Sequence, residues 1–85
     1  MIRYTVYPST DYSIYVDACE TVESLFQQAK KEHELIDVDG SRIQCYYIGE
    51  SEIRVVMSYD YDEILIEDVH DILADHFLFL PVSLS

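Results

Sequence analysis

Alternation of apolar and polar residues marks four stretches of the chain, and a period of two residues predicts β-strands. Residues 2–7 and 12–17 alternate on either side of a Pro-Ser-Thr-Asp turn, which predicts an N-terminal hairpin. Residues 42–48 and 53–59 flank a short glycine-containing segment and predict a second hairpin. The strands therefore come in antiparallel pairs joined by short turns.

Two other stretches follow the spacing of an amphipathic helix. Thr21 can cap the first, because its hydroxyl can accept a hydrogen bond from a free backbone amide. The apolar residues that follow it at helical spacing are Val22, Leu25, Phe26 and Ala29. Asp60 and Glu63 form an Asp-type capping box for the second. Its apolar stripe comprises Leu65, Val69, Ile72, Leu73 and His76.

A final apolar stretch, residues 77–82, predicts a buried closing strand that Pro81 weakens or moves to a sheet edge. The expected order is therefore ββαββαβ. Such an order favours an α+β, two-layer domain with a four- to five-stranded, mostly antiparallel sheet and both helices on one face. The absence of linkers and repeats predicts a single compact domain over residues 1–85.

The charge balance narrows the classes of function. The 85 residues hold 17 acids against 5 bases, for a net charge of −12 and a pI near 4.2. This surface repels nucleic acid and anionic membranes and attracts basic partners. Neither a signal peptide nor a membrane span is expected, because the longest apolar run is strand-sized. The cysteines Cys19 and Cys45 are expected to be reduced and mostly buried, in a cytoplasmic protein.

Acidic residues concentrate in the last third of the chain. Residues 55–85 contain seven acids and no Lys or Arg. Four of the acids recur every fourth residue, which places them on one face of the predicted second helix at steps of ~6 Å: Glu63, Glu67, Asp71 and Asp75. Like charges at this spacing cost about 0.2–0.5 kcal/mol per pair, so the row predicts a partner-binding face. The alternative is a solvated acidic face without a partner.

Tyrosine is the second unusual feature, with eight residues in a chain without Trp. Tyr46, Tyr59 and Tyr61 lie beside acidic segments, where they could supply interface area or fill the core. Tyr4 and Tyr12 are expected in the core.

Two resemblances to known families follow from these segments. Residues 16–25, after the predicted hairpin, resemble the strand-to-helix passage of ubiquitin-like β-grasp domains. The acids Glu50 and Glu52 between two strands, followed by Ser-Tyr-Asp-Tyr-Asp-Glu at residues 58–63, are similar to the acidic segment of Phox/Bem-type domains. In that family the acidic segment binds a basic face of a related domain, so the resemblance implies an adapter.

Catalytic and metal-binding patterns are absent from the sequence. Placing Gly40 at the sixth position of a calcium loop puts Leu35 and Tyr46 where carboxylates are required. The histidines show no zinc spacing, and no nucleophile, base or phosphate-binding glycine loop is evident. We therefore expect no catalytic residues, no metal and no cofactor.

Together these features predict a small, stand-alone, non-enzymatic acidic protein that occludes a basic nucleic-acid-binding surface of a larger protein. Its profile is similar to that of phage-encoded DNA-mimic inhibitors, including many anti-CRISPR proteins, which implies the host cell cytoplasm. A monomer or a homodimer is expected, with no direct binding of nucleic acid or membrane. The alternative is the Phox/Bem-type or ubiquitin-like adapter. The expected partner-binding residues are Glu50, Glu52, Tyr59, Asp60, Tyr61, Asp62, Glu63, Glu67, Asp71 and Asp75.

Overall fold

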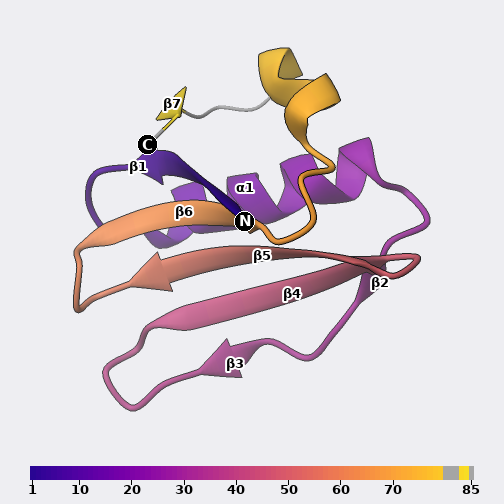
Figure 1. The fold of residues 1–85 in the computed structure, drawn as a ribbon. Helices are drawn as coiled ribbons and strands as arrows, with labels where there is room; N and C mark the ends of the chain where they lie inside the picture. Colours follow the sequence, from indigo (N-terminus) through magenta and orange to yellow (C-terminus); the bar gives the residue numbers. More distant parts are fainter. Residues whose placement is uncertain (80–82, 85) are drawn as a thin grey trace.

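A computed structural model describes residues 1–79 and 83–84, with side chains described as far as His76. The described residues form one α-helix, one 3₁₀ helix and seven strands (Figure 1). In chain order they are β1 (Ile2–Tyr7), α1 (Tyr12–Leu25), β2 (Lys30–Lys31), β3 (Leu35–Ile36), β4 (Arg42–Ile48), β5 (Ser51–Ser58), β6 (Glu63–Asp68), the 3₁₀ helix η1 (Ala74–Phe79) and β7 (Ser83–Leu84).

All strands belong to one sheet, in the order β2-β4-β5-β6-β1-β7, and β3 also pairs with β4. Because β2 and β3 share the same edge of β4, the seven strands occupy six positions. Every pairing is antiparallel. The N-terminal strand β1 therefore lies inside the sheet, between β6 and β7.

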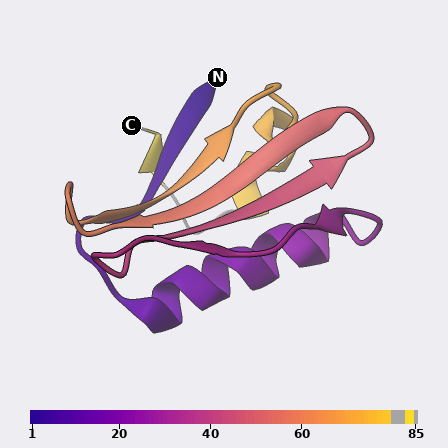
Figure 2. The same cartoon turned by 90° about the horizontal axis from the view of Figure 1, so that it is seen from below.

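Helix α1 covers one face of the sheet (Figure 2). Its buried residues, Tyr15, Ala18, Cys19 and Val22, follow the i, i+3, i+4, i+7 spacing of a single stripe. They pack on side chains from the same face of the sheet: Tyr4, Tyr46, Ile53, Val55, Met57, Ile64 and Ile66. Leu65 is buried as well but does not belong to this cluster, because successive strand residues point to opposite faces.

The expected strand at residues 12–17 is wrong, since these residues form the first turns of α1. Asp11 is the N-cap, and its carboxylate accepts hydrogen bonds from the backbone N–H groups of Ser13 and Ile14. A helix that starts at the Asp11 cap satisfies these backbone amides locally, whereas in a strand they would need an acceptor on a neighbouring strand. Thr21, the expected cap, lies inside the helix, where its hydroxyl donates to the carbonyl of Asp17 at 2.9 Å.

The expected second helix is also wrong, because its first residues form β6. This strand lies between β5 and β1, and its consecutive residues Ile64, Leu65 and Ile66 are all buried. Burial on both faces suits a strand inside a sheet, whereas a surface helix buries one stripe only. The expected order ββαββαβ, with two α-helices on one face, and the β-grasp-like architecture fail with it.

The C-terminal segment differs from the expected closing strand. Residues 74–79 form η1, where the His76 ring meets Phe26 edge-on with centroids 5.1 Å apart. Residues 80–82, the end of the expected strand, lie outside the described residues. Strand β7 pairs with β1 at the sheet edge.

Other expectations are confirmed. Strand β1 has the predicted bounds, and the second hairpin is present as β4 and β5. These strands join through a two-residue turn in which Gly49 has φ +62°, a conformation that favours glycine. The architecture is α+β in the coarse sense of one helix packed on an antiparallel sheet.

Candidate functional site

Three loops meet at one end of the sheet, and hydrogen bonds tie them together. The β5–β6 loop (residues 59–62) contacts the β1–α1 loop (residues 8–11) through Asp62. Its Oδ1 accepts from Ser9 Oγ at 3.2 Å, and from Thr10 N at 3.1 Å and Thr10 Oγ1 at 3.4 Å. The backbone of Asp62 adopts φ +50°, a left-handed conformation that aspartate tolerates better than most residues.

The same β5–β6 loop is joined to the β3–β4 loop (residues 37–41). The backbone N–H of Tyr59 donates to Ser41 Oγ at 2.9 Å. The Tyr59 ring lies against Gly40, where a Cβ would stand 3.2 Å from Cε2 of the ring. Any side chain at residue 40 would therefore displace Tyr59. We call these three loops, together with Tyr12 at the start of α1 and Glu63 at the start of β6, the turn end.

The turn end combines carboxylates with exposed tyrosine rings. Its acids are Asp11, Asp37, Asp39, Asp60, Asp62 and Glu63. Tyr59 is 50% exposed, Tyr61 80% and Tyr12 55%. Flat, half-rigid rings beside charges are typical of protein-binding surfaces.

Each of the five cations of the chain contacts a glutamate. The ion pairs are Arg3–Glu67, Lys30–Glu32, Lys31–Glu23, Arg42–Glu34, and Arg54 with both Glu52 and Glu67. These five glutamates account for the whole positive charge of the chain. The other twelve acids, which include all six at the turn end, have no cation partner among the described residues.

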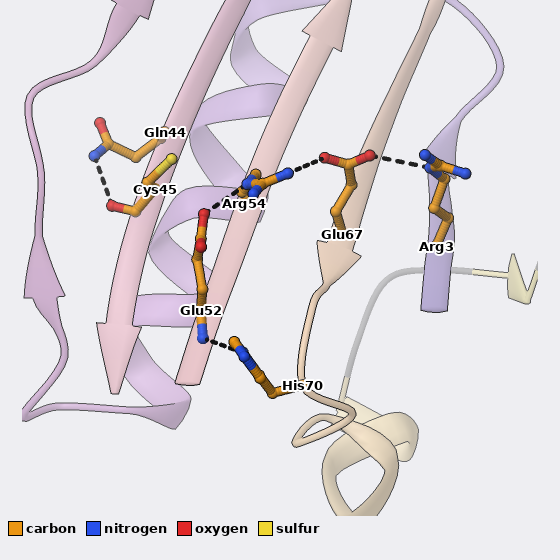
Figure 3. A network of polar contacts seen from close by, with 7 residues as sticks. All are labelled: Arg3, Gln44, Cys45, Glu52, Arg54, Glu67 and His70. Atoms are coloured by element: carbon orange, nitrogen blue, oxygen red, sulfur yellow. Dashed lines mark hydrogen bonds and ion pairs between the residues drawn. The ribbon is translucent and has the colours of Figure 1, made fainter. Parts of the chain in front are cut away.

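Four of these ionic groups form a row across β1, β6 and β5 (Figure 3). Glu67 accepts from Arg3 Nε at 3.0 Å and lies 3.6 Å from Arg54 Nη1, while Arg54 Nε donates to Glu52 at 2.6 Å. The hydrogen bond from Arg54 to Glu52 raises the pKa of the guanidinium further. The backbone N–H of Glu52 donates to His70 Nδ1 at 3.0 Å. The carboxylates of Glu52 and Glu67 are therefore already paired with arginines of the same chain.

At the turn end, four of the six acids hold the loops. Asp62 binds residues 9 and 10, and Asp11 caps α1. Asp37 and Asp39 accept backbone N–H groups within their own loop. Hydrogen bonds lower the pKa of two of these acids, chiefly the bond from the Ser13 side chain for Asp11 and that from the Ser41 backbone for Asp39. Within the described part of the chain, the carboxylates of Asp60 and Glu63 make no hydrogen bond or ion pair, so these side chains are available to a partner.

Arg42, which contacts Tyr12 of the turn end, already has an acidic partner. Arg42 Nη1 lies 2.7 Å from Glu34 Oε1, and its guanidinium carbon stands 4.9 Å from the centre of the Tyr12 ring. Tyr12, expected in the core, is instead an exposed ring that stacks on this cation. The field at the turn end is therefore negative.

The structure brings together five of the ten expected partner-binding residues: Tyr59, Asp60, Tyr61, Asp62 and Glu63. The other five, Glu50, Glu52, Glu67, Asp71 and Asp75, do not join them. Glu50 lies in the β4–β5 turn at the opposite end of β5, and Asp71 and Asp75 follow β6 at that same far end. Glu52 and Glu67 are neutralised by arginines.

The expected helical row of four acids does not exist. Glu63 and Glu67 lie on strand β6, Asp71 has φ +56° in a turn, and Asp75 belongs to η1. The four-residue spacing places side chains on one face only in a continuous helix, and residues 63–68 form a strand instead.

Sequence reasoning missed three acids of the turn end, Asp11, Asp37 and Asp39. Asp11 carried a usable signal, because it precedes the stripe formed by Tyr15, Ala18 and Cys19. Asp37 and Asp39 directly precede Gly40 in the segment that does not fit a calcium loop, and they show no other motif. No local pattern shows that their loop contacts residue 59, because strand pairing brings the two loops together.

The described residues contain no group of three or more His, Cys, Asp or Glu side chains placed to hold a metal ion. No helix in the same residues is long and apolar enough to cross a membrane. Comparisons with protein-family models, with curated proteins and with solved structures gave no significant match.

Proposed function

We propose that this chain is a non-enzymatic binding protein whose turn end occupies a basic, nucleic-acid-binding surface of a larger protein. The observation that carries the proposal is the distribution of charge. All five cations are neutralised by glutamates, whereas the six acids of the turn end are not. The uncompensated field steers the turn end toward lysines and arginines, which compete with phosphates for the same contacts.

Exposed rings complement this charge. Tyr59 and Tyr61 lie on either side of Asp60, and both present large, mostly rigid surface to a partner. Electrostatic attraction raises the rate of association, and the buried aromatic area then slows dissociation. The protein would still act as a DNA mimic, but the three loops of the turn end, and not a helix face, would present the phosphate-like charges.

The test is affinity capture from a lysate with the wild type and two charge-reversed variants. Asp60→Lys/Glu63→Lys reverses the two unengaged acids of the turn end. Asp17→Lys/Glu20→Lys makes the same change in charge at two α1 acids that hold no ion pair, and serves as the matched control. We expect the wild type and the control to capture the same nucleic-acid-binding proteins, and the turn-end variant to lose them.

Competition separates inhibition from recruitment. Excess duplex DNA or RNA should release the captured partners, because both ligands use one surface. Retention of the same partners by Asp60→Lys/Glu63→Lys at low and moderate salt would overturn the proposal. Capture that depends on Asp60 and Glu63 but ignores nucleic acid would indicate an adapter instead. An adapter has less support, because residues 58–63 lead into strand β6 and not into a helix.

A further inference from the structure

The sheet face opposite α1, which we call the open face, carries a trough beside the turn end. Two depressions of about 410 and 430 Å³ share Val56 and Ser58 as lining residues, so they adjoin on the sheet. In Figure 3 this face points toward the viewer, with α1 behind the strands. The trough runs across the strands from β3 to β6.

An apolar row forms the floor of the trough. Leu35 is paired with Ile43, Ile43 with Val56, and Val56 with Leu65, so these four side chains stand directly opposite one another on one face. Three interstrand spacings make the row about 14 Å long. Leu65 is 8% exposed and lies outside the core cluster under α1, whereas Leu35 at the sheet edge is 61% exposed. This apolar surface is not used by the helix.

The two long sides of the trough differ in charge. On one side lies the row of ion pairs, in which the arginines are matched by Glu67 and Glu52. On the other side lie Asp37, Asp60 and Glu63, which have no cation partner among the described residues. An occupant therefore meets apolar side chains in the floor and uncompensated carboxylates along one rim.

We propose that the trough binds a segment of the partner protein in which leucine-like side chains alternate with lysine or arginine. The apolar side chains would lie on the row from Leu35 to Leu65, and the cations would meet Asp37, Asp60 and Glu63. The row has the length of about four residues of extended chain. A second copy of this chain fits poorly, because it carries the same net charge of −12 and the acidic rim would repel it. The inference rests on the proposed function, since the basic partner supplies the segment.

The test uses two synthetic peptides with the same charge. One alternates lysine with leucine, and the other has serine at the leucine positions. Each is titrated into the isotope-labelled full chain, and NMR reports the affinity and the residues that shift. Burial of one leucine side chain is worth at least about tenfold in affinity, so the leucine peptide should bind about tenfold more tightly or better. It should shift the methyl signals of Ile43, Val56 and Leu65, and not those of Val22 under α1.

Two variants separate the floor from the rim. Ile43→Thr/Val56→Thr keeps the β-branched shape and removes apolar surface, so it should abolish the preference for leucine and leave the serine peptide unaffected. Asp60→Lys/Glu63→Lys should weaken both peptides by the same factor. If the double threonine variant does not fold, the wild-type methyl shifts and the single variant Val56→Thr decide the question.

Equal affinity of the wild type for both peptides would overturn this inference. The proposed function would be unaffected, because the capture assay tests it separately. A leucine preference that survives in the threonine variant would also overturn it. Sedimentation showing a dimer that Val56→Thr disrupts would identify a second copy as the occupant and overturn the peptide assignment. A leucine preference combined with indifference to Asp60→Lys/Glu63→Lys would overturn the contacts inferred for the rim and would count against the proposed function too.

Discussion

Asp68 is a fully buried carboxylate at the end of β6. It accepts hydrogen bonds from the backbone N–H groups of Ile72 at 3.0 Å and Leu73 at 2.8 Å. Asp68→Ala leaves both donors without this acceptor, and an unsatisfied buried group costs about 1–3 kcal/mol. We expect the free energy of unfolding, measured with urea, to fall by at least that amount. Asp75→Ala removes an exposed carboxylate nearby and should change it by less than about 0.5 kcal/mol; equal effects would contradict the assignment.

Cys19 and the phenols beside it make the fold sensitive to alkali. Burial raises the pKa of the Cys19 thiol to about 11 and raises the pKa of Tyr15 and Tyr46 as well. The folded chain therefore favours the protonated forms. The contribution of Cys19 to stability is complete below the ordinary thiol value of 9.0 and is lost as pH rises through about 11, and the two phenols add to the loss only above their ordinary value of 10.0.

Urea unfolding at several pH values between 8 and 11 measures this loss. Stability should decline with rising pH, and Cys19→Ala should show a shallower decline because one of the raised groups is gone. Burial also raises the pKa of the half-buried Cys45 thiol, but less than that of Cys19, so Cys45→Ala should flatten the decline less than Cys19→Ala does. Identical slopes for the wild type and Cys19→Ala would contradict the expectation.

Elements whose residues fit only a strand or only a helix could be predicted from the sequence. Elements whose residues fit both could not. Strand β1 and the β4–β5 hairpin show clear alternation, and both were found. Residues 12–17 satisfy alternation and helical spacing equally, and the Asp11 cap decides in favour of the helix. Residues 63–68 hold three consecutive apolar residues, which a helix or a buried strand can contain, and the pairing of β6 with β5 and with the distant β1 decides for the strand. That partner is about 60 residues away, so no local window could reveal it.

The N-cap of α1 gives a prediction that couples structure to pH. Hydrogen bonds, first from the Ser13 side chain, lower the pKa of Asp11 below its ordinary 3.8. The ionised cap therefore stabilises the fold above that value, and its contribution is lost as pH falls through the lower folded-state pKa. Asp11→Ala should unfold at a lower urea concentration than the wild type at pH 6.

The difference between these two proteins should shrink as pH falls from 6 toward 2, because protonation of Asp11, first in the unfolded and then in the folded state, removes the advantage of the ionised cap. Glu20→Ala, on the exposed side of α1, is the control and should follow the wild type at both pH values. A difference that persists unchanged at pH 2 would show that Asp11 acts through something other than its charge-assisted hydrogen bonds.

For the whole molecule, the twelve acids that have no cation partner within the described ranges predict stabilisation by salt. Raising NaCl from 20 to 300 mM shortens the screening length from roughly 20 Å to about 6 Å and weakens repulsion within the turn end. A gain of about 1 kcal/mol raises the Tm of a domain of this size by roughly 4–8 °C. Calorimetry should show this rise in the wild type and a smaller one in Asp60→Asn/Glu63→Gln. A Tm that falls with NaCl would contradict it.

The candidate site was predictable only in part, for a similar physical reason. Composition revealed the excess of acid, and residues 59–63 were identified because they are adjacent in sequence. Neutralisation of Glu52 and Glu67 depends on strand register, which places Arg54 opposite Glu67 and Arg3 beside it. The grouping of Asp11, Asp37 and Asp39 with residues 59–63 depends on three loops that lie at the same end of the sheet.

The position of β1 inside the sheet bears on how the protein is made. The ribosome produces β1 first, yet its partners are residues 64–68 of β6 and residues 83–84 of β7. Until residue 68 has emerged, β1 has no strand to join, and α1 lacks part of the surface that it covers. A nascent chain arrested after residue 62 should therefore leave the β1 amides open to hydrogen exchange, while the finished chain protects them. The sheet is complete only after residues 83–84 have emerged, and non-local closure of this kind is slow.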